Sequence, residues 1–198
     1  CPVTAGRGGD VRGDNGYWMS RGPANLDGPA AVGEHAGRRS VARLASRRIP
    51  TQHVPVMFEA PVAASLLGHF AGAVSGGSLY RKSSFLLDAL DRQVFAPHVR
   101  ICDAGRVPRG LGSSAFDDEG VATQDRDIVT GGVLQGYFLG SYSARKLGMR
   151  STGNAGGTHN LTLDSTGHDF AAMLRELGTG LLVTELLGQG INMVTGDY

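Results

Sequence analysis

Apolar residues recur at helical spacing in several parts of the chain. The clearest case is 169–177, where apolar side chains occupy positions i, i+3, i+4 and i+7 of one helical face and Gly178 follows as a stop. The residues on that face are Phe170, Met173, Leu174 and Leu177. The other predicted helices run from Asp27 to about Ser46, from Pro61 through the apolar stretch 65–77, and from Tyr142 to Leu147.

Capping residues support two of these helices. Asp27 is expected to be the N-cap of the helix that runs to about Ser46, which is called the first helix and has Pro29 in its first turn. Ser141 is expected to cap the helix from Tyr142 to Leu147. Val41 and Leu44 are predicted to point inward from the first helix.

Runs of β-branched and aromatic residues predict short strands between the helices. The runs 126–129 and 133–139 flank Thr130-Gly131-Gly132, so they predict an antiparallel hairpin. Residues 1–26, whose apolar cluster is 17–19, are expected to form a strand flanked by loops. The remaining predicted strands cover 54–58, 99–102, 160–163, 181–187 and 191–194.

This order of elements bears on the fold class. Strands joined by a hairpin and interrupted by single helices favour an α+β fold, with a largely antiparallel sheet and a few interspersed helices, over a parallel doubly wound sheet. A chain of 198 residues is long enough for one domain or two small ones with a real core.

The composition suggests neither a disordered nor a fibrous protein. A hydrophobic fraction of 41% and a charged fraction of 19% are ordinary for a globular protein. The 31 glycines are unusual, and pairs such as Gly76-Gly77 and Gly156-Gly157 predict tight turns between short elements.

The charge gives little reason to expect a polyanionic partner. The formal net charge is +1, so no global field attracts nucleic acid or an anionic membrane. Five arginines lie within 38–48, and we interpret them as the solvated face and basic end of a helix, with nucleic-acid contact as the alternative.

Cysteine content and hydropathy favour the cytoplasm. Only Cys1 and Cys102 are present, so there is no disulfide framework and no CxxC metal pair. No apolar run reaches the ~18 residues of a membrane span, and no export signal is visible. Because the sequence starts with Cys1 and stops directly after a strand-like run, we expect it to be a fragment.

His69 is the first candidate for metal chemistry, because it lies in an apolar helix. A zinc helix uses two histidines one turn apart with an adjacent glutamate, whereas here Gly68 precedes His69 and Ala73 stands one turn on. A packed, hydrogen-bonded histidine is therefore the favoured interpretation.

Two further clusters could form sites. Asp117-Asp118-Glu119 is the densest carboxylate group, and in a turn two of its acids could face a hard cation or an arginine, although turn formation and solvation are the simpler explanation. The segment 151–160 places glycines beside Asn154 and His159, so its backbone could bind an anion or allow another chain to approach closely. It matches no nucleotide-binding motif.

Glu185 is predicted to lie in an apolar strand within 181–187. A buried glutamate must be paired, hydrogen-bonded or protonated. Glu185 could therefore either lock the local structure or serve a site, and the sequence leaves both open.

Taken together, these motifs resemble the TldD/PmbA family, and within it the PmbA (TldE) branch. The similarity is dense after about residue 30 and looser before it. The matching segments are 76–82, 85–88, 116–121, 141–148, 152–157 and 173–198.

The resemblance implies an incomplete C-terminal domain over 51–198, preceded over 1–50 by a strand and helix from the end of the N-terminal domain or a connection. It also implies a cytoplasmic partnership with a zinc-bearing, TldD-like protease subunit that cleaves unfolded peptides. Neither a membrane nor nucleic acid is expected as a partner.

The same resemblance bears on the metal. In TldD the helix carries His-Glu-x-x-x-His, and anchoring on Leu66-Leu67 places those positions at Gly68, His69 and Ala73. Both ligands and the glutamate base are therefore replaced, so no catalytic or metal residue is expected here and zinc is expected on the partner. A further cysteine ligand of the family would lie past Tyr198.

Two main functional hypotheses follow. The first is a non-catalytic, PmbA-like subunit that shapes a peptide-binding cleft, with binding or interface residues at Asn154, Gly156, Gly157, His159 and Glu185. The alternative is a metallopeptidase active in its own right, with ligands drawn from His69, Asp117, Asp118, Glu119 and His159. A third is a nucleic-acid or regulator-binding module that uses the arginine-rich helix.

Overall fold

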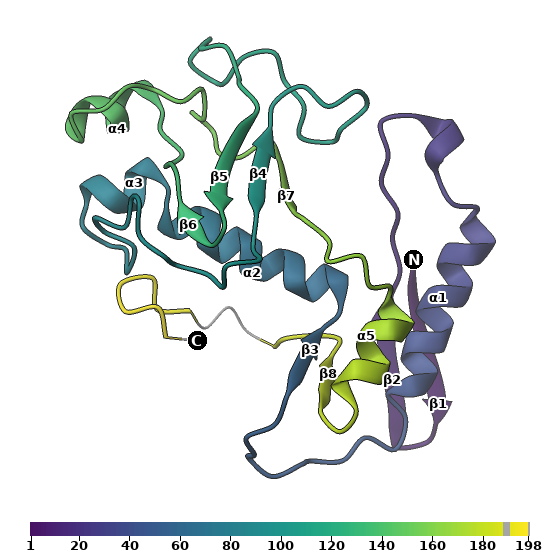
Figure 1. The fold of residues 1–198 in the computed structure, drawn as a ribbon. Helices are drawn as coiled ribbons and strands as arrows, with labels where there is room; N and C mark the ends of the chain where they lie inside the picture. The colour runs from purple at the N-terminus through teal and green to yellow at the C-terminus, as the bar shows by residue number, and fades with distance from the viewer. Residues whose placement is uncertain (188–190, 198) are drawn as a thin grey trace. The chain divides into compact units, whose positions relative to one another are not determined.

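The computed structural model describes residues 1–187 and 191–197. The chain divides into two compact units, Cys1–His53 and Val54–Tyr198. Figure 1 shows the elements of each unit along the chain.

The first unit is a β-hairpin with a helix packed on it. Its elements are β1 (Pro2–Arg7), β2 (Asp10–Asn15), the short 3₁₀ helix η1 (Pro23–Asn25) and α1 (Pro29–Ala42). β1 and β2 pair antiparallel. Ala36 and Ser40 of α1 are fully buried, and the Ser40 hydroxyl donates to the carbonyl of Val3 at 2.8 Å. The helix is therefore held to the hairpin by both packing and a hydrogen bond.

The hairpin differs from the sequence prediction for residues 1–26. Two strands form over 2–15, and the apolar cluster Tyr17-Trp18-Met19 lies outside both of them. These three side chains are 67%, 54% and 64% exposed. The prediction failed because β2, Asp-Val-Arg-Gly-Asp-Asn, has only one apolar residue and is stabilised by its partners rather than by its own composition.

The limits of α1 also differ from the prediction. Its N-cap is Gly28 rather than Asp27, and it ends at Ala42 rather than near Ser46. Val41 is 58% exposed, so the expectation that it points inward was wrong.

The arginines of α1 are partly engaged in ion pairs. Arg39 Nε and Arg43 Nε lie 3.0 and 3.1 Å from Asp14 Oδ2. Partial burial alone would raise the pKa of Asp14, but the backbone N–H of Asn15 and the two arginines hold it below the ordinary value. Two of the five arginines therefore serve the packing of helix on hairpin.

The second unit is built around a four-stranded antiparallel sheet in the order β6-β5-β4-β7. Its strands are β4 (Ile101–Ala104), β5 (Arg126–Thr130), β6 (Val133–Leu134) and β7 (Asn160–Leu163). A parallel pair, β3 (Val56–Phe58) and β8 (Leu181–Val183), is separate from this sheet. The predicted α+β class with a largely antiparallel sheet is confirmed.

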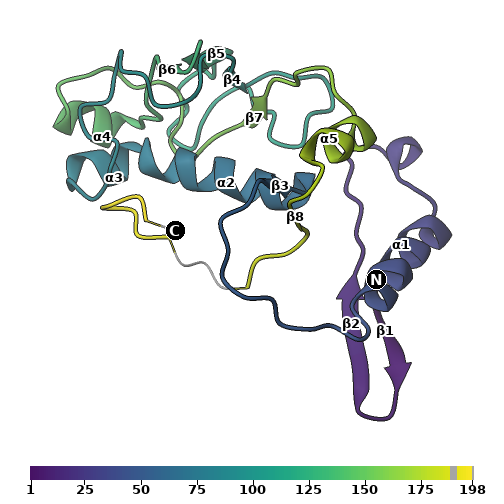
Figure 2. The same cartoon turned by 60° about the horizontal axis from the view of Figure 1, so that its bottom comes forward.

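The described residues of the second unit contain four helices. They are α2 (Ala60–Ala73), α3 (Gly76–Tyr80), α4 (Ser141–Lys146) and α5 (Phe170–Leu177). α2 runs beneath the sheet in both ribbon views (Figures 1 and 2). None of the helices in the described part of the chain is long and apolar enough to cross a bilayer.

The core of this unit lies between α2 and the sheet. Phe70 and Val74 of the α2 region pack in one cluster with Ile101, Ile128 and Leu134 from the strands. All five are at least 94% buried. Removing this much apolar surface from water, at roughly 25 cal/mol per Å², is the main force that fixes α2 against the sheet.

The hairpin of β5 and β6 forms as predicted, with Gly131 at φ +59° and Gly132 at φ +77° in its turn. Two positive φ values in a two-residue turn suit the twist of antiparallel strands. β6 is much shorter than the predicted strand 133–139. α4 begins as expected, but Gly140 is its N-cap and Ser141 makes no side-chain cap bond.

The C-terminal elements differ more from the prediction. β8 ends at Val183, so Glu185 lies beyond the strand and is exposed; the expected buried glutamate was wrong. Residues 191–194 lie in an irregular turn rather than a strand. The motif residues Gly188-Gln189-Gly190 and the terminal Tyr198 lie outside the described residues.

The amphipathic helix α5 forms where predicted. The Asp169 carboxylate accepts the N–H of Ala172 at 2.7 Å, as an N-cap should. Its apolar face is not covered, because Phe170, Met173 and Leu174 are 51%, 43% and 42% exposed.

Candidate functional site

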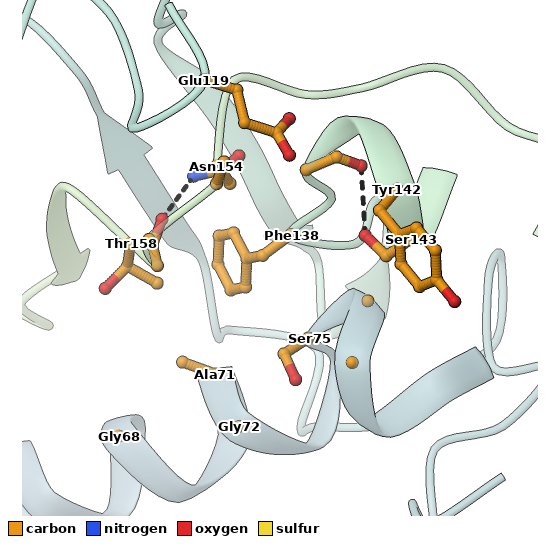
Figure 3. A pocket seen from close by; sticks show the side chains of 16 residues that line it. Gly68, Ala71, Gly72, Ser75, Glu119, Phe138, Tyr142, Ser143, Asn154 and Thr158 are labelled. Atoms are coloured by element: carbon orange, nitrogen blue, oxygen red, sulfur yellow. Dashed lines mark hydrogen bonds between the residues drawn. The ribbon is translucent and has the colours of Figure 1, made fainter. Parts of the chain in front are cut away.

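A pocket of about 540 Å³ lies where α2, α3, α4 and the loop after Asn154 meet. Figure 3 shows Phe138 in the middle, Gly68, Ala71 and Gly72 along α2, and Glu119 on the opposite side. Glycines supply seven of the sixteen lining residues: Gly68, Gly72, Gly76, Gly77, Gly140, Gly156 and Gly157. Much of the wall therefore lacks side chains, which leaves room for another main chain to approach it closely.

The junction of α2 and α3 forms the floor of the pocket. Ser75 is the N-cap of α3, and Gly76 N–H donates to the carbonyl of Phe138 at 2.8 Å. A Cβ on Gly76 would lie 2.2 Å from Ser143 Oγ, so only glycine allows α3 and α4 to approach this closely. Gly76 thus sets the distance between two walls of the pocket.

The loop 153–157 forms the facing wall and is fixed by Asp117. Asp117 Oδ2 accepts the N–H of Ala155 at 2.9 Å, and its Oδ1 accepts the N–H groups of Glu119 and Val121, each at 2.9 Å. Burial alone would raise the pKa of Asp117, but these backbone donors, with the nearby His159, hold it below the ordinary value. Asp117 is 5% exposed and acts as an anchor for the loop.

A second buried network fixes the other end of the loop. Asn154 Nδ2 donates to Asp103 Oδ2 at 2.9 Å, and His159 N–H donates to Asp103 Oδ1 at 2.8 Å. The His159 ring nitrogen Nδ1 lies 3.2 Å from the same carboxylate. Arg126 Nη1 donates to Asn154 Oδ1 at 3.2 Å, and burial lowers the pKa of Arg126 although Asp103 opposes this.

The three adjacent acids therefore do different things. Asp117 is buried under backbone donors, whereas Asp118 is exposed and lies against Gly156, where a Cβ would be 2.3 Å from Asp118 Oδ2. Glu119 lines the pocket and accepts the N–H of Ser141 at 2.6 Å. The turn expected from the sequence is present, and it positions one carboxylate at the pocket.

His69 lies away from this pocket. It lines a smaller pocket of about 180 Å³ whose other lining residues are all apolar: Leu66, Phe70, Phe85, Leu86, Val94, Phe95 and Ile191. His69 is not among the residues that line the larger pocket, to which Glu119 belongs. Its surroundings are those of a histidine packed against a core.

Zinc is the metal that the family resemblance implies, and the donors of this chain bear on whether it could bind here. Among residues 1–187 and 191–197, no three side chains of His, Cys, Asp or Glu come together where they could hold an ion. Zinc in proteins takes three or four such ligands. The described residues therefore do not fit a zinc site, and the alternative ligand set of His69, Asp117, Asp118, Glu119 and His159 is not brought together.

Of the expected binding residues, Asn154, Gly156 and Gly157 line the pocket. His159 stands behind it, against Asp103, and Glu185 is not among the lining residues. Sequence reasoning missed Asp103, Phe138 and Tyr142. Asp103 had a signal, since it follows the buried Ile101 at strand spacing, but the predicted strand stopped at Cys102.

Comparison with known proteins identifies the family. The sequence profile described as the PmbA/TldA metallopeptidase C-terminal domain matches residues 51–198. This chain belongs to that family. The resemblance noted in the sequence is confirmed.

The curated relatives extend the match to the first unit. Metalloprotease PmbA of Escherichia coli O157:H7 is 47% identical over 196 residues, which cover 99% of this chain and 44% of that protein. The Metalloprotease PmbA homolog of Haemophilus influenzae is 49% identical over 199 residues, covering all of this chain and 44% of that protein. The chain thus spans less than half the length of these relatives.

A solved structure and a more distant relative also match this chain. A crystal structure of a Bacteroides thetaiotaomicron protein, whose name refers to modulation of DNA gyrase, matches with a TM-score of 0.92 and 26% identity, covering 99% of this chain and 44% of that one. A Metalloprotease TldD homolog of Haemophilus influenzae is 33% identical over 122 residues, 61% of this chain and 25% of that protein. PmbA-like and TldD-like proteins therefore both occur among the relatives of this chain.

Proposed function

We propose that this chain is part of a PmbA-type subunit that binds unfolded peptide in its glycine-lined pocket, without holding zinc itself. In this proposal a TldD-like partner carries the zinc and cleaves the peptide, in the cytoplasm. The chain supplies shape and backbone hydrogen bonds.

The observation that carries the proposal is the chemistry of the pocket wall. Seven lining residues are glycines, and the side of α2 that borders the pocket presents Gly68, Ala71 and Gly72. An extended peptide binds through main-chain hydrogen bonds, which tolerate many side chains. A wall with few side chains leaves room for such a peptide to lie close to it, whereas metal hydrolysis would require ligands that this face of α2 does not offer.

The test is a peptidase assay of the intact protein with and without its TldD-like partner, before and after a chelator. We expect cleavage of an unfolded peptide only with the partner, and its loss on chelation. Metal analysis of the intact protein alone should find no stoichiometric zinc. Stoichiometric zinc, or chelator-sensitive cleavage without the partner, would instead favour the metallopeptidase that acts in its own right.

A glycine variant tests the pocket itself. Gly156→Ala should weaken peptide binding by about tenfold or more, because φ is +98° and the new Cβ would meet the carboxylate of Asp118. Gly167→Ala is the matched control, since φ is +87° there but no atom lies within 4 Å and the residue is outside the pocket.

Binding can be measured by fluorescence anisotropy with a labelled unfolded peptide, with thermal melts as a check on folding. If both glycine variants bind peptide as tightly as the unmodified protein, the pocket is not the binding site.

A further inference from the structure

One edge of the pocket carries a group of cations. The C-terminal ends of α3 and α4 each carry two exposed cations, and these four residues are called the cationic rim: Arg81, Lys82, Arg145 and Lys146. α3 and α4 lie side by side in both ribbon views (Figures 1 and 2). Cations at helix C-termini suit the helix dipole, but the dipole does not account for cations on two adjacent helices that both line a pocket.

Aromatic contacts connect the rim to the pocket. The Arg81 guanidinium lies 5.3 Å from the centre of the Tyr80 ring, and Lys146 Nζ lies 5.6 Å from the centre of the Tyr142 ring. The two tyrosine rings meet edge to face at 5.6 Å, and Tyr142 itself lines the pocket. A Cβ on the lining residue Gly77 would be 3.3 Å from Arg81 Nη2. At least two rim charges are therefore held at the pocket edge.

The rim is not neutralised within the described chain. Among residues 1–187 and 191–197, none of the four rim cations forms an ion pair with a carboxylate. By contrast, Arg39, Arg43 and Arg100 elsewhere in the chain all do so. Cations without counter-charges, two of them on a pair of touching tyrosines, favour an anionic ligand.

We infer that the cationic rim binds carboxylate groups of the peptide, so that the pocket prefers acidic segments. This inference rests on the proposed function and names its substrate class. The carboxylate can come from aspartate and glutamate side chains or from a peptide C-terminus. A polyanion such as nucleic acid fits less well, because the formal net charge of the chain is only +1 and no global field attracts it.

The test uses the intact protein and unfolded, labelled peptides of equal length that carry acidic, neutral or basic side chains, each with a free or an amidated C-terminus. The acidic peptide should bind about three- to tenfold more tightly than the neutral one, with the difference shrinking as salt rises, since exposed ion pairs are individually weak and screened. The double variant Arg81→Gln/Lys146→Gln should abolish this preference and leave the neutral peptide unaffected.

Arg109→Gln is the control for charge removal elsewhere, because it takes one positive charge from an exposed residue that does not line the pocket. Loss of the preference on amidation would assign the carboxylate to the C-terminus, and persistence of the preference would assign it to side chains.

Equal binding of all peptides, or a double variant that keeps the preference, would overturn this inference but not peptide binding. If no peptide binds, both proposals fail. A single-stranded oligonucleotide that binds more tightly than the acidic peptide, and is weakened by the double variant, would also overturn it.

Discussion

Asp117 is the residue on which the pocket loop most depends. One carboxylate, almost fully buried, accepts three backbone N–H groups from residues 119, 121 and 155. A buried donor that loses its acceptor costs about 1–3 kcal/mol. The loop geometry is therefore set by a side chain that does not itself line the pocket.

This predicts how stability depends on pH. The pKa of Asp117 in the folded protein lies below the ordinary value of 3.8, so the stabilisation from its ionised form is complete above that value. It is lost as the pH falls through the lower folded pKa. Asp117→Asn should lower the free energy of unfolding at neutral pH by about 1–3 kcal/mol, and the difference from the unmodified protein should narrow in acid.

Urea unfolding of both proteins at neutral pH and below pH 3.8 measures this difference. Asp118→Asn changes an exposed neighbouring carboxylate and should have little effect. A difference for Asp117→Asn that stays the same at all pH values would contradict the assigned role.

The residues of the site were only partly predictable. Asn154, Gly156 and Gly157 stood out because glycine beside asparagine marks an irregular loop, a local signal. Asp103 could not be assigned to the same place, because it reaches His159 only through the pairing of β4 with β7, more than fifty positions along the chain. Glu185 was misjudged because an apolar neighbourhood in sequence does not show where a strand ends.

At the scale of elements, the close approach of α3 and α4 controls the width of the pocket. Gly76→Ala should separate the two helices, since its Cβ would lie 2.2 Å from Ser143 Oγ and 2.5 Å from Ser143 Cβ. We expect a loss of about 1–3 kcal/mol in the free energy of unfolding and weaker peptide binding.

Gly77→Ala provides an internal comparison on the same helix. Its Cβ would lie 3.3 Å from the flexible end of Arg81, which can move, so stability should change by less than about 1 kcal/mol. Denaturant unfolding of the two variants gives the measurement. Equal effects at the two positions would show that helix contact is not what requires Gly76.

Elements with strong local signals were predicted well. α5 has its cap at Asp169 and a helical apolar repeat, and the hairpin of β5 and β6 has its Gly-Gly turn. The hairpin of β1 and β2 was missed because its strands are polar and it is stabilised by α1 from outside. Sequence patterns predict elements that have local signals such as caps, apolar repeats and turn glycines. They miss elements that are stabilised by contact with another part of the chain.

At the scale of the whole molecule, the uncovered face of α5 should govern how the isolated chain behaves. Phe170, Met173 and Leu174 are each more than 40% exposed on one helix. Exposed apolar patches of this kind favour association. We expect the chain 1–198 on its own to self-associate, and Met173→Gln/Leu174→Gln to reduce this.

Size-exclusion chromatography with light scattering over a range of concentrations tests this expectation. Val107→Gln, another exposed apolar position that lies away from α5 in the sequence, is the control and should leave association unchanged. A monodisperse, cooperatively melting chain would show that the face of α5 needs no cover.

The seven glycines of the pocket have a practical consequence for mutagenesis. Alanine scanning detects a residue by deleting its side chain, and at these positions there is nothing to delete. A conventional scan would therefore report side chains such as Phe138, Tyr142 and Glu119 and give no information at the seven glycines. Only the opposite procedure, adding one methyl group at a time, can map a surface made of main chain.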